Sequence, residues 1–265
     1  MPGQEEATPR EPAAEETSVI DRFLAVMSGK GGVGKSAITA MLAAGMQKRG
    51  LAVGVLDADI TGPSIPRIMG VRDRVGVENG KLRPTFSAGG IRVMSANLIL
   101  DREDDALIWR GPMVSNAIRQ FWEDTSWGKL DYLLVDLPPG TSDAPLTIMQ
   151  MLPGTEVLIV TSPQALASMI VRKAINMARR VGARVIGVVE NMGTAVCPRC
   201  GETFELFRGE GTEQITRDMG LPLLGKIPYD RRISELCDVG AIETYESDAV
   251  EAMVASILAV NGYGS

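Results

Sequence analysis

The fold of this 265-residue chain is decided by the stretch Gly29-Lys30-Gly31-Gly32-Val33-Gly34-Lys35-Ser36. The stretch fits the pattern G-x-x-x-x-G-K-[ST], and it stands directly after an apolar run and directly before a segment of helical composition. This setting of strand, loop and helix is the one in which the pattern forms a phosphate-binding loop. Its glycines let successive backbone N–H groups converge on phosphate oxygens, and the start of the helix adds its positive dipole end. Nucleotide binding is therefore a better explanation of the stretch than a chance glycine-rich turn.

Individual positions of the loop have predicted tasks. Lys35 is expected to reach the terminal phosphates of the nucleotide, and Ser36 is expected to bind Mg²⁺ through its hydroxyl. The predicted nucleotide-binding residues of the loop are Gly29, Lys30, Gly31, Gly32, Val33, Gly34, Lys35, Ser36 and Ala37. Lys30 is an additional lysine, because cradling phosphates within one chain does not require it.

Short apolar runs alternate with helical segments along the rest of the chain. The predicted strands are Phe23–Met27, Ala52–Leu56, Ile91–Met94, Tyr132–Val135, Val157–Val160, Arg184–Val189 and Leu223–Ile227. Several are continuous runs of Val, Ile and Leu, which is typical of strands buried on both faces of a mainly parallel sheet. The predicted helices are Ala37–Arg49, Pro112–Trp122, Ala144–Met151, Ala165–Val181, Glu210–Met219 and Asp248–Val260, with C-terminal caps at Gly50 and Gly182. This alternation predicts an α/β fold with a doubly wound, mainly parallel sheet.

Carboxylates follow two of the predicted strands. Asp57 and Asp59 come at the end of the second strand, and Asp136 ends the run Tyr132–Asp136. Because strand carboxyl ends in an open α/β sheet face one crevice, these acids are expected beside the phosphate loop. With Ser36 they form the predicted magnesium site, in which Asp59 orients or activates the attacking water. Helix capping or turn formation is the alternative role for Asp57 and Asp59.

The segment after Asp136 is predicted to be a second switch beside the γ-phosphate. It reads Leu137-Pro138-Pro139-Gly140-Thr141-Ser142-Asp143. A glycine in such a segment lets the backbone come close to a phosphate, and this task is assigned to Gly140.

A pair of cysteines, Cys197 and Cys200, follows the predicted strand that leads to Asn191. A C-x-x-C pair can supply half of a zinc or iron–sulfur site, or act as a redox dithiol. The chain has no histidine and only one other cysteine, Cys237, so a four-ligand site of thiolates and imidazoles is not available within one chain. Two chains that each contribute Cys197 and Cys200 would complete it. Two ordinary free thiols remain the alternative, and Cys237 is expected to be a small structural residue.

Composition and charge bear on the domain organisation of the chain, on the classes of partner it could bind and on its location. Residues 1–18 hold five acidic and one basic residue and three prolines, and are predicted to be a disordered acidic tail. The net charge of −6 then leaves only −2 for residues 19–265, which are predicted to form one nucleotide-binding domain carrying the cysteine pair as an inserted loop. There is no basic stripe for nucleic acid and no apolar run long enough to cross a membrane. Without an export signal or a disulfide framework, the expected location is the cytoplasm.

Lys30 makes the loop similar to the deviant Walker A motif of the nitrogenase-iron-protein and septum-positioning ATPase class. In that class the corresponding lysine reaches across a dimer interface to the partner's nucleotide. The resemblance implies that Lys30 acts in catalysis together with Lys35 and Asp59. An exposed loop lysine is the alternative.

Over residues 20–260 the chain resembles the Mrp/ApbC-type iron–sulfur cluster carrier ATPases. The shared motifs occur in the family's order, and they are Gly29–Ser36, Leu56–Pro66, Arg110-Gly111-Pro112-Met113-Val114, Asp136–Thr141, Glu190-Asn191-Met192 and Cys197–Gly201. The resemblance implies a homodimer that slowly hydrolyses ATP, binds a bridging [4Fe–4S] cluster at Cys197 and Cys200, and passes it to apo-proteins. It also implies that Asn191 contacts adenine and that Pro228 and Asp230 lie near the base.

The sequence departs from the family pattern in two places. It lacks the small amino-terminal domain of many members and the four-cysteine amino-terminal site of the eukaryotic cytosolic scaffolds, so only the bridging cluster is expected. Cys237 stands where a small residue such as glycine is expected.

Two other functions stay open. A positioning or partitioning ATPase would use its dimer on membrane or DNA, but residues 246–265 contain no lysine or arginine that would favour a membrane-binding helix. A dimer held by a purely structural zinc is the second alternative, because four thiolates suit either metal.

Overall fold

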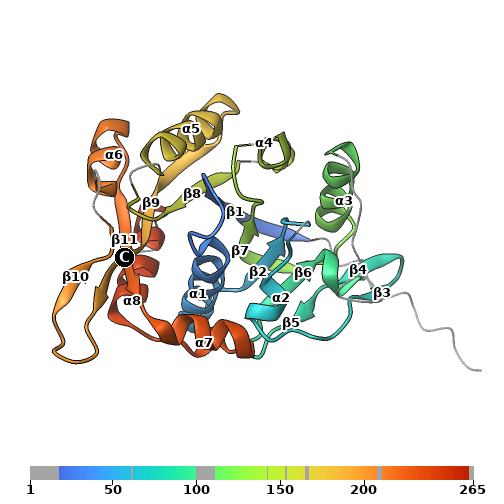
Figure 1. Cartoon of the computed structure of the whole chain (residues 1–265). Helices are drawn as coiled ribbons and strands as arrows, with labels where there is room; N and C mark the ends of the chain where they lie inside the picture. Colours follow the sequence, from blue (N-terminus) through green and yellow to red (C-terminus); the bar gives the residue numbers. More distant parts are fainter. Residues whose placement is uncertain are drawn as a thin grey trace, which may run out of the picture.

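A mainly parallel sheet forms the centre of the molecule (Figure 1). Within the described residues, nine strands belong to it, with the order β10-β9-β8-β1-β7-β2-β6-β5, and β11 also pairs with β9. The computed structural model describes residues 18–60, 62–99, 111–141, 143–152, 154–164, 167–207 and 211–262. The predicted tail up to residue 17 and Arg110 of the third shared motif lie outside this part.

Each predicted strand overlaps a strand of the structure, the second and third being shifted by one residue, and the structure adds further short strands. They are β1 (Val19–Ser28), β2 (Val53–Asp57), β3 (Gly76–Glu78), β4 (Lys81–Arg83), β5 (Thr85–Phe86), β6 (Arg92–Ser95), β7 (Lys129–Asp136), β8 (Glu156–Thr161), β9 (Arg184–Val196), β10 (Thr203–Glu205) and β11 (Leu223–Tyr229). Strands β9, β8, β1, β7, β2 and β6 run parallel, whereas β5 and β10 are antiparallel to their neighbours. The short pair β3–β4 forms a separate hairpin.

Helices cover both faces of the sheet. They are α1 (Lys35–Lys48), α2 (Ile65–Ile68), α3 (Gly111–Glu123), α4 (Asp143–Met151), α5 (Ala167–Arg180), α6 (Thr212–Met219), α7 (Arg231–Val239) and α8 (Asp248–Val260), with short 3₁₀ turns at Ala96–Leu98 and Ile242–Thr244. Figure 1 shows α1, α2, α7 and α8 below the sheet and α3, α4, α5 and α6 above it. The predicted doubly wound α/β fold is therefore confirmed.

The alternation of side chains along β1 shows how the two cores arise. Leu24 and Val26 point into a core shared with α1 and α8, whereas Ala25 and Met27 point into a core shared with α3, α4 and α5. All four side chains are fully buried. A strand covered on both faces has to be apolar at every position, which explains the continuous apolar runs in the sequence.

The ends of two helices follow the predicted capping pattern. Gly50, directly after the cap residue of α1, has φ 83°, and Gly182, shortly after α5, has φ 78°. Each donates its N–H to a carbonyl in the last turn of its helix. Left-handed glycines of this kind end helices without a steric penalty.

No helix in the described ranges has both the length and the apolar character that crossing a bilayer demands.

Candidate functional site

The phosphate loop lies between the end of β1 at Ser28 and the start of α1 at Lys35. Gly32 and Gly34 adopt positive φ angles of 76° and 78°, a conformation that glycine adopts readily. An open cleft of about 280 Å³ is lined by part of the loop and by Ala37, together with Asp59, Gly62 and Pro139; the loop residues that line it are Gly31, Gly32, Gly34, Lys35 and Ser36. The N-terminus of α1 faces this cleft, so backbone N–H groups and the helix dipole are available to an anion.

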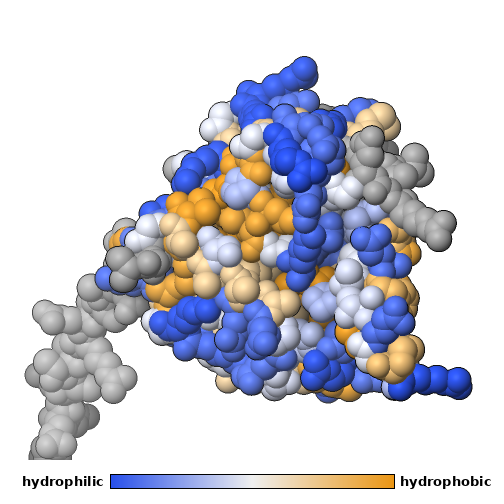
Figure 2. Space-filling view, turned by 90° about the vertical axis from the view of Figure 1, so that its left-hand side faces the viewer, coloured by the Kyte–Doolittle hydropathy of each residue, from blue (hydrophilic) through white to orange (hydrophobic). Residues whose placement is uncertain are grey.

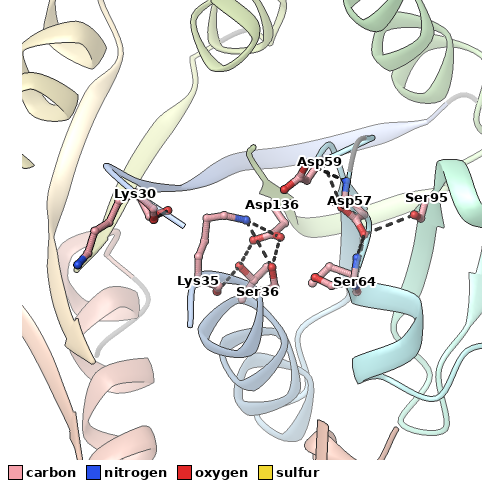
Figure 3. Close-up of polar contacts among 12 residues, drawn as sticks. Lys30, Lys35, Ser36, Asp57, Asp59, Ser64, Ser95 and Asp136 are labelled. Carbon is pink, nitrogen blue, oxygen red and sulfur yellow. Dashed lines mark hydrogen bonds and ion pairs between the residues drawn. The ribbon is translucent and has the colours of Figure 1, made fainter. Parts of the chain in front are cut away.

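Asp136 lies at the centre of a compact polar cluster (Figure 3). Its carboxylate accepts a hydrogen bond from the Ser36 hydroxyl at 2.6 Å and forms an ion pair with Lys35 at 2.7 Å. Asp136 is completely buried and the Lys35 side chain is only 7% exposed. These three residues were predicted to act together, and the structure brings them into direct contact.

Thr39 also contacts Asp136, and it was not predicted as a site residue. Its hydroxyl donates to the carboxylate at 2.7 Å and lies 3.0 Å from the carbonyl oxygen of Lys35. Thr39 is fully buried one helical turn after Lys35. It therefore holds the carboxylate from the side of α1.

Asp57 lies beside Asp136 because β2 and β7 are paired with these two residues in register. Its carboxylate accepts hydrogen bonds from the backbone N–H groups of Ser64 and Ile65 at 3.0 and 3.1 Å. Burial, and next the nearby Asp136 carboxylate, raise the pKa of Asp57 to about 8. The capping role considered for Asp57 is thus present, since it binds the amides at the start of α2.

Asp59 borders the open cleft near the phosphate loop. One of its carboxylate oxygens accepts a hydrogen bond from the N–H of Gly62 at 3.2 Å. Figure 3 shows Asp59 close to Asp57 and on the same side of the site as Asp136. The role of Asp59 in orienting water stays a prediction.

The segment after β7 returns to the phosphate loop. Gly140 has φ 95° and donates its N–H to the carbonyl oxygen of Ser28 at 2.9 Å. The predicted second switch is therefore hydrogen-bonded to the residue before the phosphate loop.

Lys30 points away from the cluster of Lys35, Ser36 and Asp136 (Figure 3). Its ammonium group donates a hydrogen bond to the side chain of Gln164, which follows β8. Gln164 was not singled out from the sequence. A lysine in this orientation is not directed at phosphates bound by its own loop.

Asn191 contacts the phosphate loop from β9. Its side-chain nitrogen donates to the carbonyl oxygen of Val33 at 2.9 Å, and only 6% of the residue is exposed. A Cβ at Gly34 would lie 2.2 Å from the same nitrogen, so this contact requires glycine there. Contact between Asn191 and adenine stays a prediction.

Pro228 and Asp230 lie at the end of β11, whose Ile227 is paired with Asn191. Asp230 caps α7 by accepting a hydrogen bond from the N–H of Arg232 at 2.9 Å. A hydrogen bond from the Arg232 guanidinium holds the pKa of this carboxyl below its usual range. The structure thus assigns a capping role to Asp230, and its place near the base stays a prediction.

Cys197 and Cys200 form the turn between β9 and β10. The N–H of Cys197 donates to Glu202 and its carbonyl accepts from Gly201, both at 2.9 Å. Both cysteines are free thiols; Cys200 is exposed and Cys197 partly exposed. Backbone N–H groups of Cys200 and Arg199 lower the pKa of Cys197, which favours the thiolate form that binds metals.

Among the described residues, no group of three or more His, Cys, Asp or Glu side chains is placed to hold a metal ion. Cys237 lies away from the hairpin in α7, packed against the core below the sheet, and burial raises the pKa of its thiol. The described part of one chain therefore offers a metal two thiolates.

Taken together, the site contains hard oxygen ligands, a buried lysine and a helix N-terminus at one cleft. Ser36 and Asp136 supply the hydroxyl and carboxylate oxygens that suit Mg²⁺ when phosphate oxygens complete its shell. The arrangement can bind a magnesium–nucleotide complex. The cysteine hairpin is a second, chemically distinct site with soft ligands.

Comparison with known proteins agrees with this chemistry. A family model described as ParA, NUBPL iron-transfer P-loop NTPase, matches residues 19–260. The iron–sulfur cluster carrier protein of Clostridium perfringens is 44% identical over 237 residues, covering 86% of this chain and 83% of that protein. The cytosolic Fe-S cluster assembly factor CFD1 of Chaetomium globosum is 40% identical over 244 residues, covering 86% and 80%.

Solved structures show the same similarity. The nucleotide-binding protein of Archaeoglobus fulgidus in complex with ADP superposes with a TM-score of 0.78 at 43% identity, covering 88% of this chain and 91% of that one. The septum site-determining protein MinD of Pyrococcus horikoshii, complexed with Mg-ADP, has a TM-score of 0.68 at 21% identity, covering 93% and 99%. At that identity the second similarity concerns the fold alone.

Proposed function

This chain belongs to the NUBPL iron-transfer P-loop NTPase family, and from that premise we propose that it is an ATP-hydrolysing iron–sulfur cluster carrier. In this proposal two chains form a homodimer, hold one [4Fe–4S] cluster between them and pass it to apo-proteins. The cluster is the cargo of the reaction. The name of the Clostridium relative supports the carrier role.

The cysteine hairpin is the observation that carries this proposal. Cys197 and Cys200 lie at an exposed turn, and no third ligand approaches them among the described residues. A four-thiolate cluster site is therefore completed by the same hairpin of a second chain. The lowered pKa of Cys197 favours the ligand form.

The end of the molecule that carries the hairpin also presents apolar side chains. Val196, Phe204 and Tyr229 are 55%, 47% and 48% exposed. Phe204 and Tyr229 flank Ala195 on neighbouring strands. Figure 2 views this end of the molecule and shows hydrophobic areas bordered by hydrophilic ones. Exposed apolar groups beside an incomplete metal site support association with a second chain.

Nucleotide hydrolysis would use the cluster around Asp136. Lys35 binds the terminal phosphates, while Ser36 and Asp136 hold Mg²⁺, directly or through water. Bound Mg²⁺ would neutralise charge on the phosphate oxygens. Asp59 orients the attacking water from the edge of the cleft, and Asp57 supports the magnesium shell.

A second chain would complete the nucleotide site. Lys30 reaches the nucleotide of the partner, and its orientation away from Lys35 supports this role. Dependence on a partner chain makes hydrolysis slow in the monomer. We place the protein in the cytoplasm, as the word cytosolic in the name of the CFD1 relative supports.

The decisive test is the metal content after anaerobic reconstitution with iron and sulfide. We expect about four irons per two chains and a visible charge-transfer absorption. Both should be lost in Cys197→Ser and kept in the matched control Cys237→Ser. About one zinc per two chains and no iron would instead make the site structural and refute the carrier role.

A further inference from the structure

Strand β9 physically joins the two sites. Asn191 on this strand holds the carbonyl oxygen of Val33 in the phosphate loop. Cys197 follows β9 directly, after Val196. A displacement of the phosphate loop therefore has a short covalent path to the cysteine turn.

The strand is irregular between these two residues. Met192 has φ 59°, and within the described residues only Asn79 and Met192 are non-glycine residues with positive φ. The pairing with β11 shifts register here, because Ile227 pairs with Asn191 but Tyr229 pairs with Ala195. Between these pairs β9 advances by four residues and β11 by two, so β9 bulges. Bulges of this kind redirect a strand and recur beside functional sites.

The Glu190 side chain lies close to the bulge. A Cβ at Gly193 would lie 2.4 Å from a carboxylate oxygen of Glu190, so a larger residue there would displace that side chain. The carbonyl oxygen of Gly193 accepts a hydrogen bond from the N–H of Leu206, just after β10, at 3.0 Å. The bulge thus directly follows Asn191 in β9 and is hydrogen-bonded to the end of the cysteine hairpin.

Beyond the bulge the hairpin has little contact with the core. All three residues of β10 are exposed, as are Val196 and Cys200. Figure 1 shows the β10 hairpin projecting from the edge of the sheet. An element held mainly by its own hydrogen bonds can tilt as a unit when its base changes.

We propose that Asn191 is a positioning residue that senses the phosphate loop, and that the Met192 bulge transmits nucleotide binding to the orientation of Cys197 and Cys200. Nucleotide binding favours one position of Val33, and the hydrogen bond from Asn191 carries that preference into β9. Coupling between two binding sites is reciprocal. If nucleotide changes the affinity of the hairpin for a metal by some factor, the metal changes the affinity for nucleotide by the same factor. The biological purpose of this coupling rests on the proposed carrier function, but the coupling between nucleotide and hairpin requires no bound metal.

The test therefore uses the metal-free protein and measures the alkylation rate of Cys197 and Cys200 with a maleimide, in a Cys237→Ser background. A non-hydrolysable ATP analogue with Mg²⁺ should change this rate by about fivefold or more. Met192→Gly accepts the positive φ without strain and loosens the bulge. In this variant the ratio of the alkylation rates with and without the nucleotide analogue should be close to one. Asn79→Gly is the matched control, because it relieves the same backbone conformation in the distant β3–β4 turn, and it should keep the full ratio.

A second variant guards against misfolding of the first. Asn191→Asp removes the donor to Val33 with little change in shape, and at saturating nucleotide it should also lose the ratio. An unchanged ratio in Met192→Gly, or no nucleotide effect in the starting protein, would overturn the inference. Loss of the ratio in Asn79→Gly as well would refute the assignment to the bulge. A protein that shows the coupling but binds no iron would refute the carrier role and leave the coupling intact.

Discussion

Asp57 and Asp136 place two buried carboxylates at the ends of neighbouring strands. Lys35 forms an ion pair with Asp136 at 2.7 Å. Asp57 instead relies on backbone N–H groups of the segment that starts α2. These amides and Lys35 lower its pKa less than burial and Asp136 raise it, so the pKa reaches about 8. In the absence of Mg²⁺, the proton is therefore the preferred partner of Asp57 at neutral pH.

This raised pKa predicts a specific dependence of stability on pH. Unfolded Asp57 ionises near 3.8 and folded Asp57 near 8, so the folded state binds more protons between these values. The contribution of Asp57 to the free energy of unfolding is complete below pH 4 and falls as pH rises to 8. Asp57→Asn removes this pH-dependent contribution. The free energy of unfolding of the variant, relative to that of the unmodified protein, should therefore rise by up to about 1.4 kcal/mol per pH unit between pH 4 and 8.

Urea unfolding at pH 5, 7 and 9, without nucleotide and with a chelator, measures this difference. The relative gain of Asp57→Asn should level off above pH 8. A difference that is the same at all three pH values would show that Asp57 is already ionised in the folded protein.

Most residues around Asp136 could be found from the sequence, but Thr39 could not. Ser36 and Lys35 belong to a loop motif, and Asp136 ends an apolar strand. Thr39 is an ordinary helical threonine in the sequence, and its task depends on α1 lying against the end of β7. Side chains that act through tertiary contact, such as Thr39 and Gln164, carry no local signal.

Predictability of the helices and strands depends on how deeply each is buried. The helix at Asp248–Val260 was predicted with its observed limits, and the central strands were found because they are apolar throughout. Strand β10 was missed because its three residues are exposed and their pairing depends on the cysteine turn. Helix α7 was missed because none of its residues is buried, although Asp230 at its cap was an available signal.

The end of α7 is built around a close backbone contact. Gly240 has φ 74°, and a Cβ there would lie 2.6 Å from the Cα of Gly70, which follows α2. Gly70 also has positive φ, at 67°. Helices α2 and α7 therefore meet through two glycines, and this contact supports α2, whose first amides bind Asp57.

Gly240→Ala should destabilise the protein through both the left-handed backbone and this clash. Gly220→Ala is the matched control, because Gly220 follows α6 with φ 62° and a Cβ there meets nothing within 4 Å. We expect Gly240→Ala to lower the free energy of unfolding by about 1–3 kcal/mol more than Gly220→Ala. Denaturant unfolding of both variants measures the difference, and equal losses would mean that the contact between α2 and α7 relaxes easily.

At the scale of the whole molecule, the cysteine pair and Lys30 both lack, within one chain, the groups that they need for their proposed roles. The described residues offer two thiolates at the hairpin, and Lys30 points away from the phosphate loop that carries it. Both are completed in the proposed homodimer, in which each chain supplies thiolates and a lysine to its partner. A symmetric dimer exchanges such groups in pairs, so a defect in one chain can be located by mixing variants.

Mixing two inactive variants tests the trans role of Lys30 directly. In the proposed mechanism, Lys35→Ala removes a residue that acts on the nucleotide of its own chain, whereas Lys30→Ala removes one that acts on the partner's nucleotide. In a mixed dimer, the site of the Lys30→Ala chain keeps its own Lys35 and receives Lys30 from the Lys35→Ala chain. Because half of randomly mixed dimers contain one such site, the mixture should recover about a quarter of the unmodified ATP hydrolysis rate.

The control mixture combines Lys35→Ala with Asp59→Ala. Both residues act within their own chain in the proposed mechanism, so each site of a mixed dimer still lacks one of them and the mixture should stay inactive. Hydrolysis is measured after incubating equal amounts of the two chains long enough for subunit exchange, and mass measurement of a tagged chain confirms that mixed dimers form. Mixed dimers of Lys30→Ala and Lys35→Ala without activity would place Lys30 in its own site. Activity in the control mixture would instead show that Asp59 or Lys35 is the residue shared between chains.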